Sequence, residues 1–393
     1  MSSGGEAGAA EAGREGAALR SAVEAMLAAA WRDPGFCVPN QDVYPHQWLW
    51  DSCFHAVVWG ELGSGRGVVE LGNVLARQAD DGFVPHMVYW RAPELHADFW
   101  GRPGASVITQ PPMYGHALAE QRRLGFDVPA ESIERARAGL LHLGDRQPTP
   151  SGLIPILHPW ESGCDDSPRW DDHLPSDGER RRQRKGELVA ALARAAAGHG
   201  VANPAFAVGS VGFNALVAWN ARELVDVFDQ PDDALARLAD RLATAVTARW
   251  HEDRWIDDPG TGAPGRQAGP EAVPTVDSLA ALLVDPRHDG FDQLLDPGAF
   301  AAPFGPRGVR RAEATYRPDV YWRGSAWPQL TYVLMLAAER AGRPDAAAVV
   351  ARWLVDGATR SGLAEHWNPE TGAGLGARPQ TWAGLAVPAL RRL

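Results

Sequence analysis

Apolar residues recur every three or four positions along most of this chain, the spacing that places them on one face of an α-helix. In Ala17–Trp31 they are Leu19, Val23, Met26, Leu27 and Ala30, and Asp33-Pro34-Gly35 ends the pattern. A second helix is expected from Asp51, whose carboxylate suits an N-cap, to Leu62. The same spacing predicts helices over Val68–Arg77, Pro111–Leu124, Ala130–Leu143, Glu187–Ala197, Gly212–Val227, Asp232–Trp250, Thr275–Val284, Trp327–Ala341 and Asp345–Thr359.

The order of these helices predicts an all-α fold, because no strand-helix-strand alternation appears. Paired helices, with aromatic residues collected in the loops between them, favour a toroid of two concentric helical rings with its functional loops at one end. We expect residues 1–15 to be a disordered acidic tail and residues 16–393 to form one domain. The turn-rich stretch Pro259–Gly269 is interpreted as an insertion and not a domain linker. Its GxGxxG match is set aside, because no strand precedes it and no helix follows.

Composition narrows the range of partners. The formal net charge of −11 disfavours nucleic acid and anionic membranes, since both would be repelled. No secretory signal or long apolar run is visible, and the three cysteines show no CxxC spacing, so we expect a cytoplasmic protein with reduced thiols. The 16 Trp residues are frequent for a chain of 393, as is common where sugars are bound, although a large core also uses tryptophan.

The segment His158–Trp170 carries the densest candidate chemistry. It reads His-Pro-Trp-Glu-Ser-Gly-Cys-Asp-Asp-Ser-Pro-Arg-Trp, which favours a shaped loop over a long helix or a strand. Its carboxylates are Glu161, Asp165 and Asp166. Aromatic faces stack on sugar rings, and carboxylates in a partly apolar pocket can be tuned as acid or base.

Two later clusters complement this loop. Ala364–Glu370 contains Glu365, His366 and Trp367, so it can supply a second carboxylate. Glycoside hydrolysis needs such a pair, one group protonated to assist the leaving oxygen and one ionised. Tyr316–Trp327 adds aromatic walls and Arg323, which suits holding a carboxylate or orienting a hydroxyl.

Taken together, these motifs resemble family 63 glycoside hydrolases, in particular their bacterial mannosylglycerate and glucosylglycerate hydrolase branch. The acid loop at His158–Trp170 matches that branch closely, and the resemblance spans residues 44 to 382. Four more segments agree in order: Gln47-Trp48-Leu49-Trp50-Asp51-Ser52, Thr109-Gln110-Pro111-Pro112, Tyr321-Trp322-Arg323-Gly324 and Glu365-His366-Trp367-Asn368-Pro369-Glu370-Thr371-Gly372.

The resemblance implies an (α/α)6 barrel and hydrolysis with inversion, with Asp165 as general acid and Glu365 as general base. It implies no catalytic metal and no cofactor. The positions that match the sugar pocket of such enzymes are Tyr44, Trp50, Asp51, His86, Gln110, Tyr321, Trp322, Gly324 and Gln380. We add Glu161, Arg323 and Trp382 as candidate substrate contacts, although Glu161 equally suits bracing the loop and Trp382 suits the core.

The sequence differs from the family pattern in the segment that follows Asp165. Asp166 stands where relatives often have Asn, and no Tyr occurs between Tyr114 and Tyr316, although relatives use tyrosine and arginine there to close over glycerate. The basic run Arg180–Lys185 is interpreted as a solvated or substrate-closing segment. From the resemblance as a whole we expect an inverting glycosidase that acts on a small α-glucoside or α-mannoside. A glycosylglycerate is the first substrate to test.

Three alternatives stay open. One is a trehalase-like or oligosaccharide α-glucosidase activity. Another is a sugar epimerase, for which His46 or His86 with His366 would have to move protons. The third is a non-catalytic sugar-binding protein. The sequence also leaves a homo-oligomer open.

Overall fold

The computed structural model describes residues 3–228, 232–261 and 272–393. Its long helices pair in sequence order, each outer helix packing on an inner element. The α-helices are α1 (Ser3–Ala30), α2 (Leu49–Glu61), α3 (Arg66–Leu75), α4 (Ala97–Trp100), α5 (Tyr114–Arg123), α6 (Ala130–Gly144), α7 (Gly178–Ala190), α8 (Val211–Val227), α9 (Asp233–Thr247), α10 (His288–Leu295), α11 (Pro328–Arg340), α12 (Pro344–Ser361) and α13 (Ala386–Ala389). The 3-10 helices are η1 (Pro159–Ser162), η2 (Pro168–Trp170), η4 (Val276–Leu283), η5 (Thr381–Leu385) and η6 (Leu390–Arg392).

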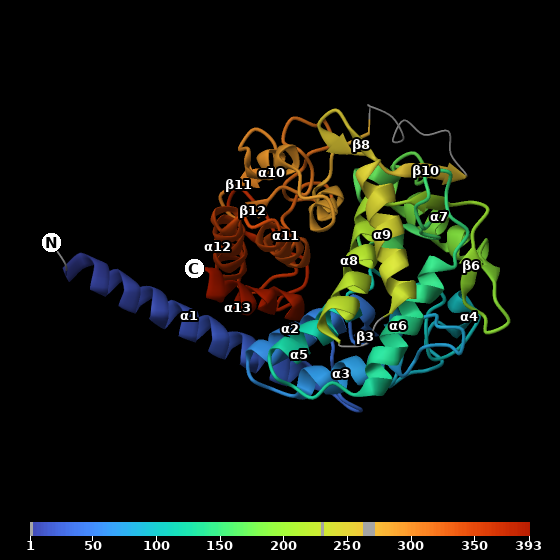
Figure 1. The fold of residues 1–393 in the computed structure, drawn as a ribbon, viewed down its shortest axis with the longest axis horizontal. Helices are drawn as coiled ribbons and strands as arrows, with labels where there is room; N and C mark the ends of the chain where they lie inside the picture. The colour runs from blue at the N-terminus through green and yellow to red at the C-terminus, as the bar shows by residue number, and fades with distance from the viewer. Residues whose placement is uncertain (1–2, 229–231, 262–271) are drawn as a thin grey trace.

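The inner elements form a closed ring. Around it the contacts run α2 to α5, α5 to α8, α8 to η4, η4 to α11, α11 to η5 and η5 back to α2. Figure 1 shows α8 and α11 on opposite sides of this ring, with α2 and α5 below. Helices α3, α6, α9, α10 and α12 pack outside it, and α1 packs on η5 and α13. This is the (α/α)6 barrel that the resemblance implied.

Burial separates the two rings. Every residue of α2 and η4 is buried, whereas α9 buries only one stripe, which includes Leu235, Leu238 and Leu242. An inner helix contacts neighbours on all sides and is therefore apolar all round, but an outer helix needs a single apolar face. An outer helix shows its apolar stripe as a periodic pattern, and an inner helix shows a longer apolar stretch, so both kinds leave a local signal that predicted the positions of most long helices.

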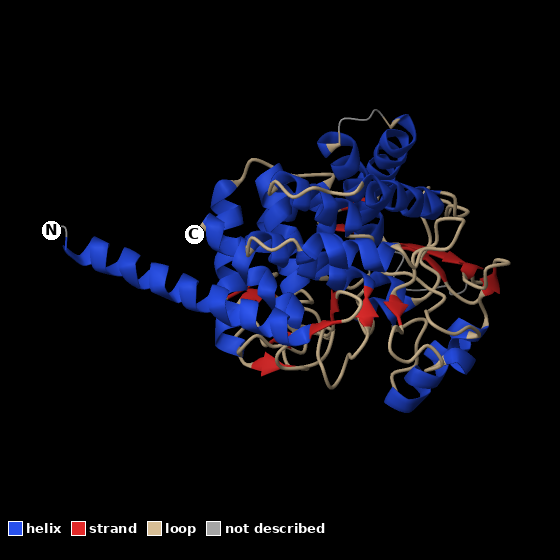
Figure 2. Cartoon of the chain, turned by 90° about the horizontal axis from the view of Figure 1, so that it is seen from below, coloured by secondary structure: helices blue, strands red, loops and turns tan. Residues whose placement is uncertain are grey.

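Short strands and loops gather at one end of the barrel, as Figure 2 shows. Six antiparallel pairs join strands that follow one another in the strand order: β1 (Trp31–Arg32) with β2 (Phe36–Cys37), β3 (Gln47–Trp48) with β4 (Met87–Val88), β5 (Ala193–Arg194) with β6 (Gly200–Ala202), β8 (Trp250–His251) with β9 (Arg254–Trp255), β11 (Ala301–Ala302) with β12 (Gly305–Pro306), and β13 (His366–Trp367) with β14 (Gly374–Leu375). A longer-range pair joins β7 (Ala207–Gly209) to β10 (Asp258–Thr261). In register, Trp48 faces Met87 and Trp367 faces Gly374.

Four expectations need correction. Helix α1 begins at Ser3, so the Ala- and Glu-rich segment expected to be a disordered tail is helical, in line with the helix propensity of those residues. The helix expected at Glu187–Ala197 is α7, Gly178–Ala190, capped by the Asp177 side chain, and Ala193–Arg194 forms β5 instead. The segment Val276–Leu283 is 3-10 and not α-helical. Asp51 is not an N-cap, because Trp48 holds that position and Asp51 lies inside α2.

Most of the insertion expected at residues 259–269, with the GxGxxG match in it, lies outside the described residues. None of the helices in the described part of the chain has the length and apolarity needed to cross a membrane.

Candidate active site

One pocket brings together residues from loops that are far apart in the sequence. It is lined by Pro39, Tyr44, Trp48, Trp50, Asp51, Gln110, Gly163, Asp165, Tyr321, Trp322, Glu365, Gln380 and Trp382. Asp165 lies between η1 and η2, Glu365 lies between α12 and β13, and Asp51 is in the first turn of α2. The barrel therefore places the two predicted catalytic carboxyl groups in the same pocket.

Burial tunes the first of these carboxyl groups. It raises the pKa of Asp165 to about 7, and the nearby charges of Asp166 and Glu365 add to the effect against the opposing charge of Lys185. A carboxyl group of this kind is about half protonated near pH 7 and mostly protonated below it, as a general acid requires.

The neighbouring Asp166 has the opposite character. Burial alone would raise its pKa, but the Lys185 ammonium and the Arg181 guanidinium hold the pKa of Asp166 below its usual value. Lys185 Nζ lies 2.9 Å and Arg181 Nε 2.7 Å from Asp166 Oδ1. Asp166 is thus an ionised anchor for α7.

Glu365 is held by two hydrogen bonds. The Tyr44 hydroxyl donates to Oε1 at 3.0 Å, and the Ala377 amide donates to Oε2 at 2.9 Å. Burial raises the pKa of Glu365, and both bonds oppose that change because they stabilise the carboxylate. Gly376 makes room for this contact: its φ is +71°, and a Cβ there would lie 2.3 Å from Glu365 Oε2.

Several polar atoms in the pocket wall have no hydrogen-bond partner in the described protein. They are Trp48 Nε1, Asp51 Oδ1, Trp322 Nε1 and Gln380 Oε1. Burial raises the pKa of Asp51 to about 7. Because unpaired buried polar atoms are costly, two donors and two acceptors on residues that line one pocket indicate a ligand rich in hydroxyl groups.

The aromatic wall is built from stacked rings. Trp322 stacks on Trp327 with ring centroids 3.6 Å apart, and Trp327 stacks in turn on His366 at 4.5 Å. Trp322 has a φ of +57°, a left-handed backbone conformation that residues other than glycine rarely adopt. Such backbone strain persists only where the surrounding structure enforces it, and it is common at functional sites.

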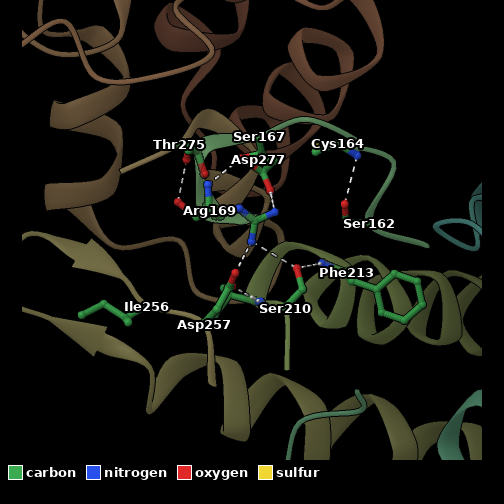
Figure 3. Close-up of polar contacts among 12 residues, drawn as sticks. Ser162, Cys164, Ser167, Arg169, Ser210, Phe213, Ile256, Asp257, Thr275 and Asp277 are labelled. Atoms are coloured by element: carbon green, nitrogen blue, oxygen red, sulfur yellow. Dashed lines mark hydrogen bonds and ion pairs between the residues drawn. The ribbon is translucent and has the colours of Figure 1, made fainter. Parts of the chain in front are cut away.

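The loop that carries Asp165 is braced at both ends. At its start, Glu161 is fully buried, accepts the Thr109 and Leu157 amides and binds the Arg146 guanidinium through both oxygens. At its end, Arg169 pairs with Asp257 and Asp277, as Figure 3 shows, and stacks on Trp170 at 4.5 Å. Gly163, at φ +72°, packs on the Trp50 ring, where a Cβ would lie 2.4 Å from the indole.

Four predicted substrate contacts lie elsewhere. Glu161 is a brace outside the pocket lining, because its acceptor oxygens are bound by protein donors. Arg323 forms a two-point ion pair with Asp171, at 2.6 Å for each bond. Gly324 faces the Tyr316 ring and the Arg317 carbonyl. The fourth, His86, lines an adjoining cavity, and burial lowers its pKa to about 3.

This adjoining cavity shares Trp48, Gln110 and Asp165 with the first pocket. Its other lining residues are His86, Met87, Tyr89, His96, Phe99, Trp100 and Trp160. Of these lining residues the sequence predicted only His86 as a contact; it did not predict the others, nor Trp48, Pro39 and Gly163 of the first pocket. Only Trp48 had a local signal, its place beside Trp50 and Asp51.

Comparison with known proteins gives a consistent result. Residues 44–383 match the family described as the mannosylglycerate hydrolase MGH1-like glycoside hydrolase domain. The chain is 30% identical to mannosylglycerate hydrolase of Thermus thermophilus, over 90% of this chain and 96% of that protein. It is 26% identical to glucosylglycerate hydrolase of Mycolicibacterium hassiacum, over 88% and 91% of the two chains. A crystal structure of a family 63 mannosylglycerate hydrolase from Thermus thermophilus with Tris and D-glycerate superposes with a TM-score of 0.76, at 25% identity, covering 94% of this chain and 99% of that one.

Proposed function

The chain belongs to the mannosylglycerate hydrolase MGH1-like glycoside hydrolase family, and from this membership we propose that it hydrolyses a small α-glucoside or α-mannoside of glycerate with inversion. The observation that carries the proposal is the meeting of Asp165 and Glu365 in one pocket from separate loops. Membership of a hydrolase family sets aside the epimerase and the non-catalytic binding protein.

Asp165 acts as the general acid in this proposal. Its protonated carboxyl group gives a proton to the glycosidic oxygen while the bond to the anomeric carbon breaks. Glu365 takes a proton from a water molecule that attacks the opposite face of the sugar, so the product anomer is inverted. An inverting pair is expected to stand about 6.5–9.5 Å apart, which leaves room for that water.

The unpaired polar atoms define the sugar subsite. Asp51 and Gln380 offer acceptor oxygens to sugar hydroxyls, and the Trp48 and Trp322 indoles offer donors. Tyr44 has two roles here, because it lines the pocket and orients the base. Recognition by fixed hydrogen bonds would discriminate strongly against sugars that lack a matching hydroxyl.

The adjoining cavity is assigned to the aglycone. Asp165 is shared by both spaces, which is where the acid must stand to reach the oxygen between sugar and aglycone. Lys185 lies next to the cavity wall: its Nζ is 5.8 Å from the ring of Trp160 and 2.9 Å from Asp166 Oδ1. A glycerate carboxylate would be attracted to that charge.

A second candidate, cleavage of a neutral aglycone as in trehalose or a gluco-oligosaccharide, is favoured by a specific observation. The cavity wall is mainly aromatic, and Arg181 and Arg323 are paired with Asp166 and Asp171. NMR of hydrolysis with glucosylglycerate, mannosylglycerate and trehalose tests both candidates. Glycerate release with an inverted sugar anomer is expected; a retained anomer would overturn the mechanism, and cleavage of trehalose alone would establish the second candidate.

The proposal extends to the chain as a whole. We place residues 16–393 in one catalytic domain, because α1 packs against η5 and α13 near the other end of the chain. A cytoplasmic location fits the free, buried thiols of Cys37, Cys53 and Cys164.

A further inference from the structure

Away from the sugar pocket, three potential metal ligands meet from separate segments. Asp81 follows α3, His142 is in the last turn of α6, and His199 immediately precedes β6. One ligand atom from each lies within 4.8 Å of the others. Nitrogen and carboxylate oxygen ligands in this number are typical of a site for a divalent transition metal.

The distances suit a small coordination sphere. His199 Nε2 lies 3.0 Å from Asp81 Oδ2, and His142 Nδ1 lies 3.9 Å from Asp81 Oδ1. The two imidazole centroids are 5.3 Å apart. With Zn–N bonds of about 2.0–2.1 Å and tetrahedral angles, ligand atoms stand about 3.3 Å apart and imidazole centroids about 5 Å apart. Small side-chain rotations would therefore complete the site.

His199 provides an independent indication. Its side chain is 0% exposed, and neither ring nitrogen has a hydrogen-bond partner among the described residues. The contact with Asp81 is close but lacks hydrogen-bond geometry. Buried imidazole nitrogens without partners are costly, and a metal bond would satisfy one of them.

Contacts with neighbouring residues orient both imidazole rings without a metal ion. Phe83 stacks on His199 with centroids 4.2 Å apart and ring planes 4° from parallel. His142 Nδ1–H donates to the Asp81 carbonyl oxygen at 2.9 Å, a bond that an ion bound at Nδ1 would replace and an ion bound at Nε2 would keep. The Asp81 side chain is 45% exposed, which gives an ion access from solvent and leaves a position for water.

Two other groups of potential ligands in the described chain differ in this respect. His55 uses one ring nitrogen with Glu70 and the other with Thr381. His116 is similarly engaged by Glu223 and Tyr332. Both histidines are saturated by protein partners, so a metal would have to break existing hydrogen bonds. Of the three groups in the described chain, the one around His199 combines closeness with unused nitrogen atoms.

We propose that Asp81, His142 and His199 bind one divalent transition metal ion, Zn²⁺ being the ion that their nitrogen and oxygen donors suit best. The ion would tie the loop after α3 and the end of α6 to the β5–β6 hairpin. Gly200, next to His199, donates to the Val107 carbonyl, so the clamp lies on the side of the hairpin that meets the barrel. The role is structural, and it is independent of the proposed hydrolysis.

The test uses the full-length, untagged protein, stripped with chelator and dialysed, then titrated with Zn²⁺ by calorimetry with metal analysis after gel filtration. Wild type should bind one equivalent and melt at a higher temperature with Zn²⁺. Asp81→Asn, which changes an exposed side chain, and His199→Gln should each weaken binding at least tenfold and remove the thermal shift. The exposed His251→Gln is the matched control and should behave as wild type.

Co²⁺ supplies a second measurement that needs no enzymatic activity. Wild type should show the visible absorption of a low-coordinate Co²⁺ site, and Asp81→Asn should lose it. If His199→Gln fails to fold, Asp81→Asn decides alone. Zn²⁺ affinity and Co²⁺ spectra unchanged in Asp81→Asn, or no bound metal in wild type, would overturn the proposal.

Discussion

The hydroxyl of Tyr44 donates a 3.0 Å hydrogen bond to Oε1 of Glu365, joining two pocket residues that lie 321 positions apart. This bond orients the Glu365 carboxylate, the proposed base, and stabilises its ionised form. Hydrogen bonds to charged groups contribute about 1.5–3 kcal/mol.

Tyr44→Phe should raise the pKa of Glu365 and lower kcat roughly 10- to 100-fold at neutral pH, the loss expected from a bond of that strength. Because the removed bond favours the carboxylate, the acidic limb of the kcat profile should move to higher pH. Tyr316→Phe is the matched control, since Tyr316 donates at 2.7 Å to Glu370, outside the pocket. An acidic limb that stays in place would show that Tyr44 does not tune the base.

Replacing each catalytic carboxyl group should have a distinguishable effect. Asp165→Asn and Glu365→Gln should each lower kcat about 10²- to 10⁴-fold on the natural type of substrate. Only Asp165→Asn should recover on an activated aryl glycoside, whose leaving oxygen needs no proton. Asp166→Asn serves as control and should keep far more activity, because that carboxylate anchors α7. Equal recovery of both variants would contradict the division of roles.

The raised pKa of Asp165 carries a stability consequence. A folded pKa of about 7 against an ordinary 3.8 means that the folded state holds the proton more tightly, so stability falls as pH rises from about 4 to 7. The cost above pH 7 is at most roughly 4 kcal/mol. Asp165→Asn should therefore unfold at higher denaturant concentration than wild type at pH 8, and show no such gain at pH 4. An equal difference at both pH values would exclude the linkage.

The same titration sets the activity profile. kcat/KM should fall as pH rises through about 7, because the acid loses its proton, and should fall at low pH as Glu365 becomes protonated. Initial rates across pH 4–9 measure both limbs. In Asp165→Asn, assayed on an activated aryl glycoside, the alkaline limb should disappear while the acidic limb stays. Persistence of the alkaline limb in that variant would assign it to another group.

Arg169 should affect stability and kcat because it holds the loop that carries Asp165 in position. Arg169→Met leaves Asp257 and Asp277 buried without their cation, and losing one partner of a buried pair costs about 3–5 kcal/mol. We expect that loss in the free energy of unfolding, together with a larger fall in kcat than rise in KM. The control Arg222→Met removes an ion pair with the exposed Asp240 and should change stability by less than about 1 kcal/mol. Unchanged denaturation of Arg169→Met would remove its role as a brace.

A substitution of Lys185 can show whether the natural aglycone is negatively charged. Lys185→Gln should raise KM for glycerate glycosides and leave KM for trehalose nearly unchanged. Arg181→Gln is the matched control, because it also loses contact with Asp166 Oδ1, while Lys185 is the one placed over Trp160. Equal changes on both substrates would indicate that Lys185 acts only through Asp166.

Much of the helical framework follows from local pattern. The helices predicted around α2, α6, α8, α11 and α12 are present, because a buried helical face repeats its apolar residues whatever lies opposite. The short α10 and α13 were missed, since one or two turns carry too little periodicity to detect. The helix predicted at Glu187–Ala197 was placed too far along the chain, because α7 buries the charged residues Arg181 and Lys185. Their burial depends on ion pairs with Asp166, which lies in another loop.

Local sequence was enough to indicate the family, and its ordered motifs named Asp165, Glu365 and most of the residues that line the proposed sugar pocket. The different pKa shifts of Asp165, Asp166 and Glu365 came from the tertiary structure, because a pKa depends on neighbours and burial that sequence spacing does not encode. The tertiary structure turned Glu161 into a brace, Asp166 into an ionised anchor and Arg323 into a partner of Asp171. It also brought Asp81, His142 and His199 together, three residues whose separation along the chain follows no metal-binding spacing and whose contact exists only because the barrel closes.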